Sequence, residues 1–141
     1  MLKHMKALIY SGKIMSIGGE DDRFKGKKNV IMLPYVSFEE MLDLINHASF
    51  CILPIENVKF SFGQIRLLQQ MAMGKCVIIP ETISLIDYGT DGFSTMFYKS
   101  EYVATCRSAM QRALDDKLLV ERIGLNARSV VYDEFTEEKM A

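Results

Sequence analysis

Four short, continuously apolar runs, separated by amphipathic segments, constrain this sequence more than any other feature. They are Ile14–Ile17, Val30–Leu33, Phe50–Leu53 and Cys76–Ile79, and a weaker run follows at Thr95–Tyr98. A strand exposed on one face alternates apolar and polar residues, whereas a strand of a parallel sheet is covered on both faces and is apolar throughout. Because such strands are joined by right-handed helical crossovers, the pattern predicts an open α/β domain with a mostly parallel sheet and helices on both faces.

Two helices between these runs have clear boundaries in the sequence. Ser37 and Glu40 form a capping box, which predicts a helix that ends at about His47. A second helix is predicted from about Gly63 to Met73, and Gly74 follows where a left-handed residue closes a helix. The buried stripe expected for this second helix consists of Ile65, Leu68, Met71 and Ala72.

The two ends of the chain are less sharply patterned. Ser100 is the expected cap of a helix whose inward residues are Tyr102, Val103, Cys106, Met110, Ala113 and Leu114. Two further helices are expected at Lys117–Ile123 and Asn126–Phe135. Near the N-terminus, Lys6–Tyr10 fits either the last turns of a helix closed by Gly12 or a strand, and the helix is favoured. With a helix there, the domain would lack the strand that normally comes first.

Composition narrows the class of protein. With 141 residues, 49% of them hydrophobic, the chain suffices for one core, so a single domain, 1–141, is predicted. A formal charge of -1 gives no general attraction to nucleic acid. Cys51, Cys76 and Cys106 stand singly in apolar stretches without metal-ligand spacing, so buried thiols are expected and a zinc site or disulfide is not. Neither a membrane span nor a signal peptide is recognisable, which predicts a cytoplasmic protein.

The loop after the third apolar run is the most informative candidate site. In open α/β sheets, ligands bind beyond the carboxyl ends of the strands. This loop runs from Pro54 to Gln64 and leads directly into the second helix. Gly63 would let a backbone approach a ligand closely, and the first helical turn offers unpaired N–H groups to a phosphate. The hydroxyl of Ser61 could add a donor, or Ser61 could serve only as a helix cap.

Several segments in order resemble the nucleotide-sugar-binding half of GT-B glycosyltransferases, particularly glycosyltransferase family 4 (glycosyl transferases group 1). The resemblance covers about residues 14 to 141, and it depends on the order and spacing of matches that are individually weak. The matching segments are Asn29–Val36, Ala48–Pro54, Met71–Ile78, Asp91-Gly92, Ala127-Arg128 and Phe135-Thr136. The resemblance implies a Rossmann-like fold, the C-terminal half of a GT-B enzyme.

The resemblance also implies which residues meet the donor. In the family, two glutamates eight positions apart contact the sugar and the ribose, and Ser61 and Gln69 stand at the matching positions. An amide lacks the charge assistance of a carboxylate, so this loop is interpreted as a variant donor loop, although Gln69 also fits a solvated helix face. The family's phosphate-binding Arg and Lys would precede this chain. Lys59 is the candidate cation, with a flexible surface lysine as the alternative.

The complete predicted donor site therefore takes residues from two loops. Its members are Tyr35 beside the base, and Lys59, Ser61, Phe62, Gly63, Gln64 and Gln69 around the diphosphate and ribose. No catalytic residue is assigned, and neither a metal nor a cofactor is expected, because the UDP- or GDP-linked sugar is itself the donor substrate.

The function implied is donor binding for hexosyl transfer to a glycan or lipid-linked acceptor, as in polysaccharide biosynthesis. An acceptor-binding N-terminal domain, in a separate or longer chain, would be the partner, and the isolated chain is expected to be inactive. Peripheral contact with a membrane is left open, and no nucleic-acid partner is expected. Two alternatives remain: a degenerate, non-catalytic binding or assembly module, and a flavodoxin-like nucleotide-binding domain.

Overall fold

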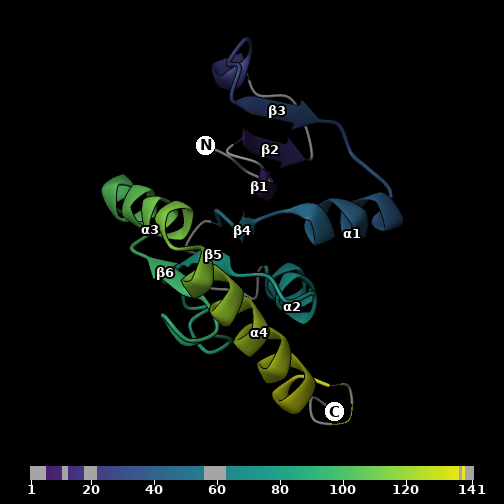
Figure 1. Cartoon of the computed structure of the whole chain (residues 1–141), viewed down its shortest axis with the longest axis vertical. Helices are drawn as coiled ribbons and strands as arrows, with labels where there is room; N and C mark the ends of the chain where they lie inside the picture. Colours follow the sequence, from purple (N-terminus) through teal and green to yellow (C-terminus); the bar gives the residue numbers. More distant parts are fainter. Residues whose placement is uncertain (1–5, 11–12, 18–21, 56–62, 137, 139–141) are drawn as a thin grey trace.

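The computed structural model describes residues 6–10, 13–17, 22–55, 63–136 and 138, and for residues 6–17 and 23 only the backbone. Within these limits the chain forms one six-stranded sheet in the order β3-β2-β1-β4-β5-β6 (Figure 1). The strands are β1 (Lys6–Tyr10), β2 (Lys13–Ile17), β3 (Val30–Leu33), β4 (Phe50–Ile52), β5 (Val77–Pro80) and β6 (Met96–Tyr98). Every apolar run of the sequence contributes a strand, so the predicted α/β class is confirmed.

The central strand, β1, corrects one expectation. Lys6–Tyr10 is a strand and not the end of a helix, and it pairs antiparallel with both β2 and β4. The remaining pairs, β2–β3, β4–β5 and β5–β6, are parallel. Tyr10 lies opposite Lys13, so only Ser11-Gly12 separates the two paired strands. That dipeptide between two apolar runs is a hairpin signal, whereas Gly12 was interpreted as a helix terminator.

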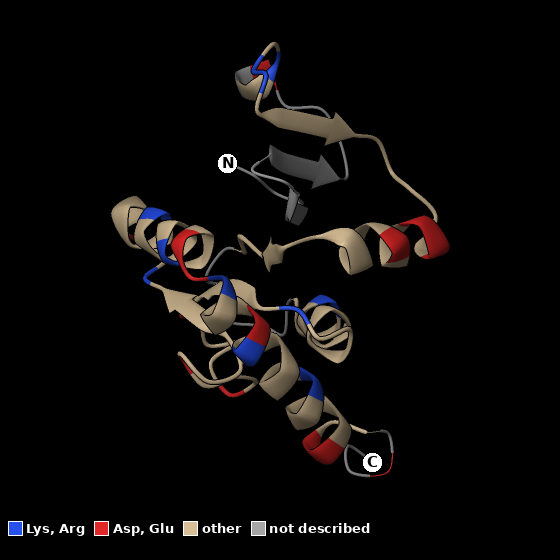
Figure 2. Ribbon diagram, in the orientation of Figure 1, with Lys and Arg blue, Asp and Glu red and all other residues tan. Residues whose placement is uncertain are grey.

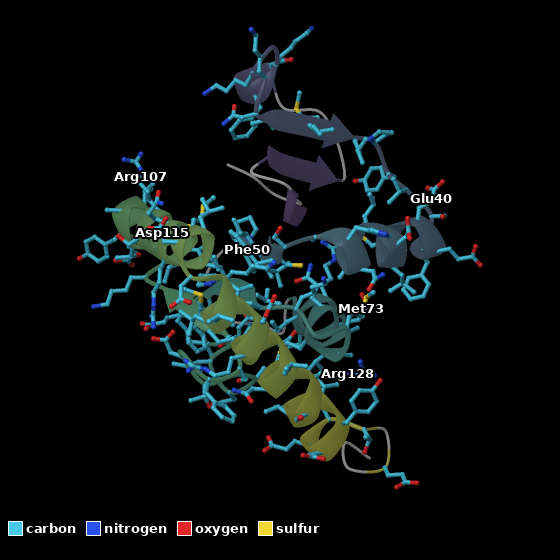
Figure 3. The ribbon with its side chains drawn as sticks, viewed as in Figure 1. Glu40, Phe50, Met73, Arg107, Asp115 and Arg128 are labelled. Carbon is cyan, nitrogen blue, oxygen red and sulfur yellow. The ribbon has the colours of Figure 1, made fainter. Side chains whose placement is uncertain are left out.

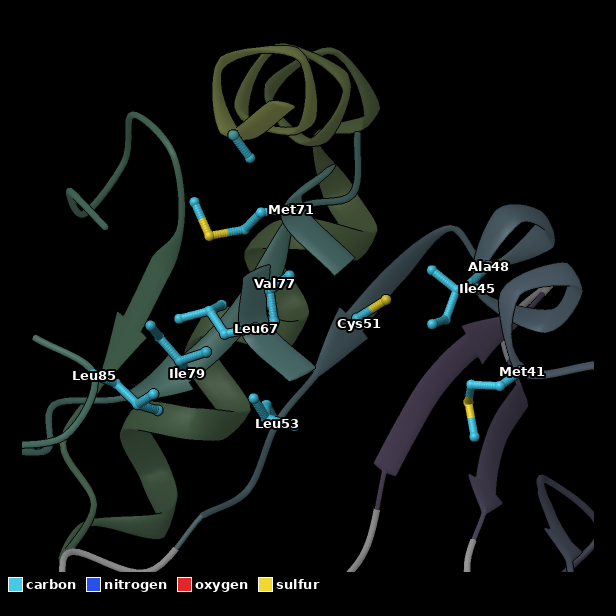
Figure 4. Close-up of a cluster of buried hydrophobic side chains, with 11 residues drawn as sticks. Met41, Ile45, Ala48, Cys51, Leu53, Leu67, Met71, Val77, Ile79 and Leu85 are labelled. Atoms are coloured by element: carbon cyan, nitrogen blue, oxygen red, sulfur yellow. The ribbon is translucent and has the colours of Figure 1, made fainter. Parts of the chain in front are cut away.

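Helices cover both faces of the sheet. The helices are α1 (Phe38–His47), α2 (Gln64–Ala72), α3 (Val103–Asp115) and α4 (Lys117–Glu134), and a short 3-10 helix spans Asp22–Phe24. Alternate residues of β4 and β5 enter two separate hydrophobic clusters, because neighbouring side chains of a strand point to opposite faces. Cys51 and Val77 pack with residues of α1 and α2 (Figure 4), whereas Phe50 (labelled in Figure 3) and Ile78 belong to the cluster formed with residues of α3 and α4.

The first helix forms as its sequence predicts. The Ser37 hydroxyl accepts a bond from the Glu40 amide, and the Glu40 carboxylate accepts one from the Ser37 amide, which completes the capping box. The helix ends at His47, where the sequence placed its end. Two buried residues, Met41 and Ile45, fix its inner face against the sheet.

The second helix begins and ends where expected but buries a different face. Gly74 follows it with a φ of 76°, the left-handed value expected of a closing glycine. The residues that α2 buries are Leu67, Gln70 and Met71, whereas Ile65, predicted to be inside, is 73% exposed. Of the predicted stripe only Met71 is fully buried. The prediction was wrong because it excluded Gln70, a polar residue that packing places inside.

Gln70 yields the first testable prediction. Its side chain is 2% exposed, and its Oε1 atom has no hydrogen-bond partner among the described residues. A buried acceptor without a partner costs about 1–3 kcal/mol, so Gln70→Leu should raise the free energy of unfolding by about 1 kcal/mol. Urea denaturation would measure the change. Gln69→Leu, at a half-buried neighbouring position, is the control, and an equal gain in both variants would contradict the explanation.

The C-terminal helices differ from expectation at two points. Tyr102, not Ser100, is the N-cap of α3. The Lys99 amide donates a hydrogen bond of 2.9 Å to the hydroxyl of Thr105. As a result Tyr102 and Val103, expected inside, are 61% and 78% exposed. Leu114 is exposed as well. The last two predicted helices are one continuous helix, α4, which runs through Gly124.

Candidate functional site

The predicted site lies at the edge of the sheet where its five like-directed strands end. At this edge β3 is followed by residues 34–37, β4 by the segment leading to α2, and β5 by the loop 81–95. Since β4 and β5 are hydrogen-bonded neighbours, residues 53–55 after β4 and the loop after β5 leave the sheet at adjacent positions. The start of α2 therefore lies at the edge of the sheet where the sequence predicts the ligand to bind, with the loop after β5 as its neighbour.

Gly63 occupies the N-cap of α2 in a conformation that favours glycine. Its φ is 87°, and no side chain caps the helix, so the first-turn N–H groups have no side-chain partner among the described residues. The Cβ of any other residue would lie 2.0 Å from Cδ1 of Ile55 and 3.9 Å from Cδ2 of Leu85. Gly63 is thus favoured by its backbone conformation, and any side chain there would also have to displace the end of the Ile55 side chain.

Gln64 connects α2 to the neighbouring loop. Its Nε2 atom donates a hydrogen bond of 3.0 Å to the carbonyl of Ser84, in the loop that follows β5. The side-chain amide nitrogen of Gln64, a member of the predicted donor site, is therefore already engaged within the protein. The Oε1 atom of the same side chain remains an acceptor.

Arg66 is a candidate that the sequence reasoning missed. It is exposed on the first turn of α2, and it is the only charged residue of that helix (the blue segment of α2 in Figure 2). A cation near a helix N-terminus opposes the helix dipole and is unfavourable for helix stability unless an anion is bound there. No acidic residue occupies this first turn. A cation on the first turn of a helix, with no acidic residue beside it, is the sequence feature that could have identified Arg66 as a site residue.

The other predicted site residues lie apart or outside the described part of the chain. Tyr35 is 81% exposed and follows β3, which β2 and β1 separate from β4. Three strand spacings amount to about 14 Å, so the sheet does not bring Tyr35 next to Gly63. Gln69 is half-buried on α2. Lys59, Ser61 and Phe62 lie outside the described residues, and their roles stay predictions.

The thiols take no part in this site. Cys51 lies on β4 and Cys76 directly precedes β5, but the two belong to clusters on opposite faces of the sheet, and both are free. Burial raises the pKa of each to about 12. Burial also raises the pKa of Cys106, which is only partly covered. A thiol must ionise to act as a nucleophile, so these groups are structural.

The thiol reactivity of the folded protein follows from these pKa values. At about pH 8 we expect Cys51 and Cys76 to resist a chromogenic aromatic disulfide, because both are buried and protonated. Only Cys106 should react before unfolding. All three thiols should react in denaturant, which serves as the control. Rapid reaction of more than one thiol in the native protein would contradict the burial of β4 and β5.

Other features of the described chain lie away from this edge. A cavity of about 380 Å³ lies near the start of β4 and β5, with Ser49, Lys75 and Lys117 among its lining residues. There the Lys75 ammonium donates to the carbonyls of Asn46 and Ala48, at 2.8 Å each, and so closes the end of α1. Within the described ranges, no cluster of His, Cys, Asp or Glu is suited to a metal, and no helix is long and apolar enough to span a membrane.

Known structures share this arrangement. None of the protein-family models matches the sequence, and no curated protein matches it. Sucrose-phosphate synthase from Thermosynechococcus elongatus superposes with a TM-score of 0.73 at 20% identity, over 88% of this chain and 34% of the synthase. Anabaena HepE, solved with UDP, gives 0.70 at 14% identity, over 80% of this chain and 30% of HepE.

A third neighbour is itself a single domain. The C-terminal domain of a glycosyl transferase group 1 family protein, LpcC from Francisella tularensis, gives a TM-score of 0.68 at 15% identity, covering 79% of this chain and 56% of the other. The chain thus has the Rossmann-like fold of the C-terminal half of a GT-B enzyme, as the resemblance implied. It spans about a third of the synthase and of HepE.

Proposed function

We propose that this chain is the nucleotide-sugar donor-binding domain of a GT-B glycosyltransferase and that it binds the donor diphosphate at the first turn of α2. The observation that carries the proposal is the start of this helix, which lies at the carboxyl edge of the sheet, begins at a left-handed glycine and has no side-chain cap from the residues that the structure describes. The amides of such a turn, together with the helix dipole, favour an anion.

The comparisons support the class of ligand. HepE was solved in complex with UDP and with UDP-glucose, and its fold superposes on this chain with TM-scores of 0.70 and 0.69. UDP- or GDP-linked sugars are therefore the proposed donors. Membership of glycosyltransferase family 4 is part of this proposal, supported by the segments that resemble that family.

The charge of the diphosphate requires cations as well as amides. Arg66 projects from the turn that would hold the phosphates, and its guanidinium could donate to two phosphate oxygens at once. We assign the same task to Lys59 and a hydroxyl donor to Ser61, both on the segment preceding α2. Gln69 would contact the ribose as an amide in place of a carboxylate, and Tyr35 would face the base from the loop after β3.

Sugar transfer would need a second domain. In the synthase and in HepE, about two thirds of the chain lies outside the region that matches this one. We propose that an acceptor-binding domain, in a separate or longer chain, places an acceptor hydroxyl against the donor while the α2 amides and cations stabilise the departing diphosphate. The chain by itself would then bind donors without transferring sugar at an enzymatic rate. A cytoplasmic location, with peripheral membrane contact for a lipid-linked acceptor, belongs to the same proposal.

Calorimetry with UDP, GDP and their glucose conjugates tests the proposal. Saturable binding is expected, and Arg66→Gln should weaken it about 5-fold or more and reduce its dependence on salt, because one charge-assisted contact is lost. Arg122→Gln, which removes an exposed arginine from α4, is the control and should bind as the unmodified chain does. Failure of every nucleotide to bind would contradict donor binding and favour a degenerate, non-catalytic module.

A further inference from the structure

The hydrogen bond between Gln64 and Ser84 is the one side-chain bond that the described residues form between the start of α2 and the loop after β5. Gln64 is the first residue of the helix, adjacent to the amides proposed to hold the diphosphate. Ser84 belongs to the segment that follows the neighbouring strand. The bond is partly buried, with a length of 3.0 Å, so it links two ligand-edge segments directly.

The loop on the Ser84 side is internally rigid. The Ile86 amide bonds to the Thr82 carbonyl at 2.9 Å, and the Thr82 and Ser84 hydroxyls lie 3.1 Å apart in a buried contact. Leu85 is fully buried, beside the position that a Cβ at Gly63 would occupy. Further along, Tyr88 stacks on Phe135 with ring centroids 5.3 Å apart. These contacts connect the residues of the loop to one another and to the end of α4.

We infer that Gln64 is a positioning residue, which sets the distance between the α2 turn and the loop containing Thr82–Leu85 through its bond to Ser84. This inference rests on the proposed donor site. A bound nucleotide would contact both segments, and a contact displaced by about 1 Å can cost a large part of its binding energy. Gln64 would therefore raise donor affinity through Ser84, with its amide nitrogen turned away from the ligand.

Removing the hydrogen-bond donor of the Gln64 side chain, its Nε2 atom, tests the inference. Gln64→Met keeps the length of the side chain but cannot donate, so we expect the UDP affinity to fall about 3- to 10-fold, as befits one neutral hydrogen bond. Asn126→Ala is the matched control, because it removes a 3.0 Å amide bond to the Phe93 carbonyl in the same loop, away from α2. That variant should keep the full affinity for UDP. An equal loss in both would show a general loosening of the loop and overturn the specific role of Gln64.

A second variant adds a readout that a purely structural role would not move. Gln64→Glu introduces a carboxylate that cannot donate to the Ser84 carbonyl, but the protonated acid, formed near pH 4, can. Its UDP affinity, taken as a ratio to the unmodified chain at each pH, should recover as the pH falls from about 7 to 4.5. A flat ratio would overturn the inference. Absence of UDP binding to the unmodified chain would instead overturn the donor site and this role together.

Discussion

Gly124→Ala is expected to destabilise the folded chain by about 3 kcal/mol or more, even though alanine is the better helix former by about 1 kcal/mol. Gly124 lies buried in the middle of α4. A Cβ added there would lie 2.1 Å from the carbonyl oxygen of Gly74 and 3.0 Å from its carbonyl carbon. These are backbone atoms of the turn that closes α2, so no side-chain rotation can relieve the overlap. The whole of α4 would have to move away from α2.

Urea denaturation of Gly124→Ala beside a matched substitution isolates this effect. Ser129→Ala also introduces the better helix former, but with a smaller gain in propensity and at an exposed position of the same helix, so it should change the free energy of unfolding by less than about 0.5 kcal/mol. Equal stability of the two variants would mean that α4 does not approach the Gly74 turn closely. The same displacement should also weaken nucleotide binding, because α4 packs against the helix proposed to hold the diphosphate.

The second large effect is expected from Gly63→Ala, which should abolish measurable UDP binding and lower stability by about 2 kcal/mol. A residue with a side chain at a φ of 87° costs about 1–2 kcal/mol. The added methyl group also overlaps Cδ1 of Ile55. Any relaxation of the backbone here rotates the first-turn amides away from their common direction, which is the geometry that the proposed phosphate site requires. Calorimetry and urea denaturation would measure the two effects separately.

A double-mutant cycle separates the two costs of Gly63→Ala. Ile55→Val deletes only the Cδ1 methyl group, so combining it with Gly63→Ala should recover about 1 kcal/mol of the lost stability. Gly26→Ala is the control for backbone conformation alone, because Gly26 has a φ of 80° with no atom within 4 Å of the added Cβ. If Gly63→Ala costs no more than Gly26→Ala, the packing of Ile55 against Gly63 contributes nothing.

The stacking of Phe135 on Tyr88 is expected to stabilise the loop after β5. Phe135→Ala removes the ring that stacks on Tyr88 and should speed hydrogen exchange in the loop after β5. Tyr132→Ala is the control, since Tyr132 is exposed near the same helix end and its ring contacts only Arg128 among the described aromatic and cationic pairs (Figure 3 shows Arg128 beside α4). Unchanged exchange in Phe135→Ala would show that the loop needs no support from α4.

Features that depend on residues close together along the chain could be predicted from the sequence. The apolar runs specified strands, of which β4 and β5 are covered on both faces. The Ser37–Glu40 capping box set the start of α1, and Gly74 set the end of α2. Each involves interactions within one turn or one strand, so a short stretch of sequence contains the whole energetic reason. The order of those features along the chain was also enough to indicate the GT-B fold, which the comparisons bear out.

Features whose contacting residues are distant along the chain could not be predicted and depend on how the elements pack. The sequence predicted two helices, Lys117–Ile123 and Asn126–Phe135, with Gly124 between them, but Gly124 lies inside one continuous α4, where only a glycine leaves room for the Gly74 backbone. Pairing with β2 and β4 made β1 a strand, packing placed Gln70 inside, and the Ser84 carbonyl fixed the direction of the Gln64 amide. Local propensity differs by about 1 kcal/mol between such alternatives, and a long-range contact of comparable energy reverses it.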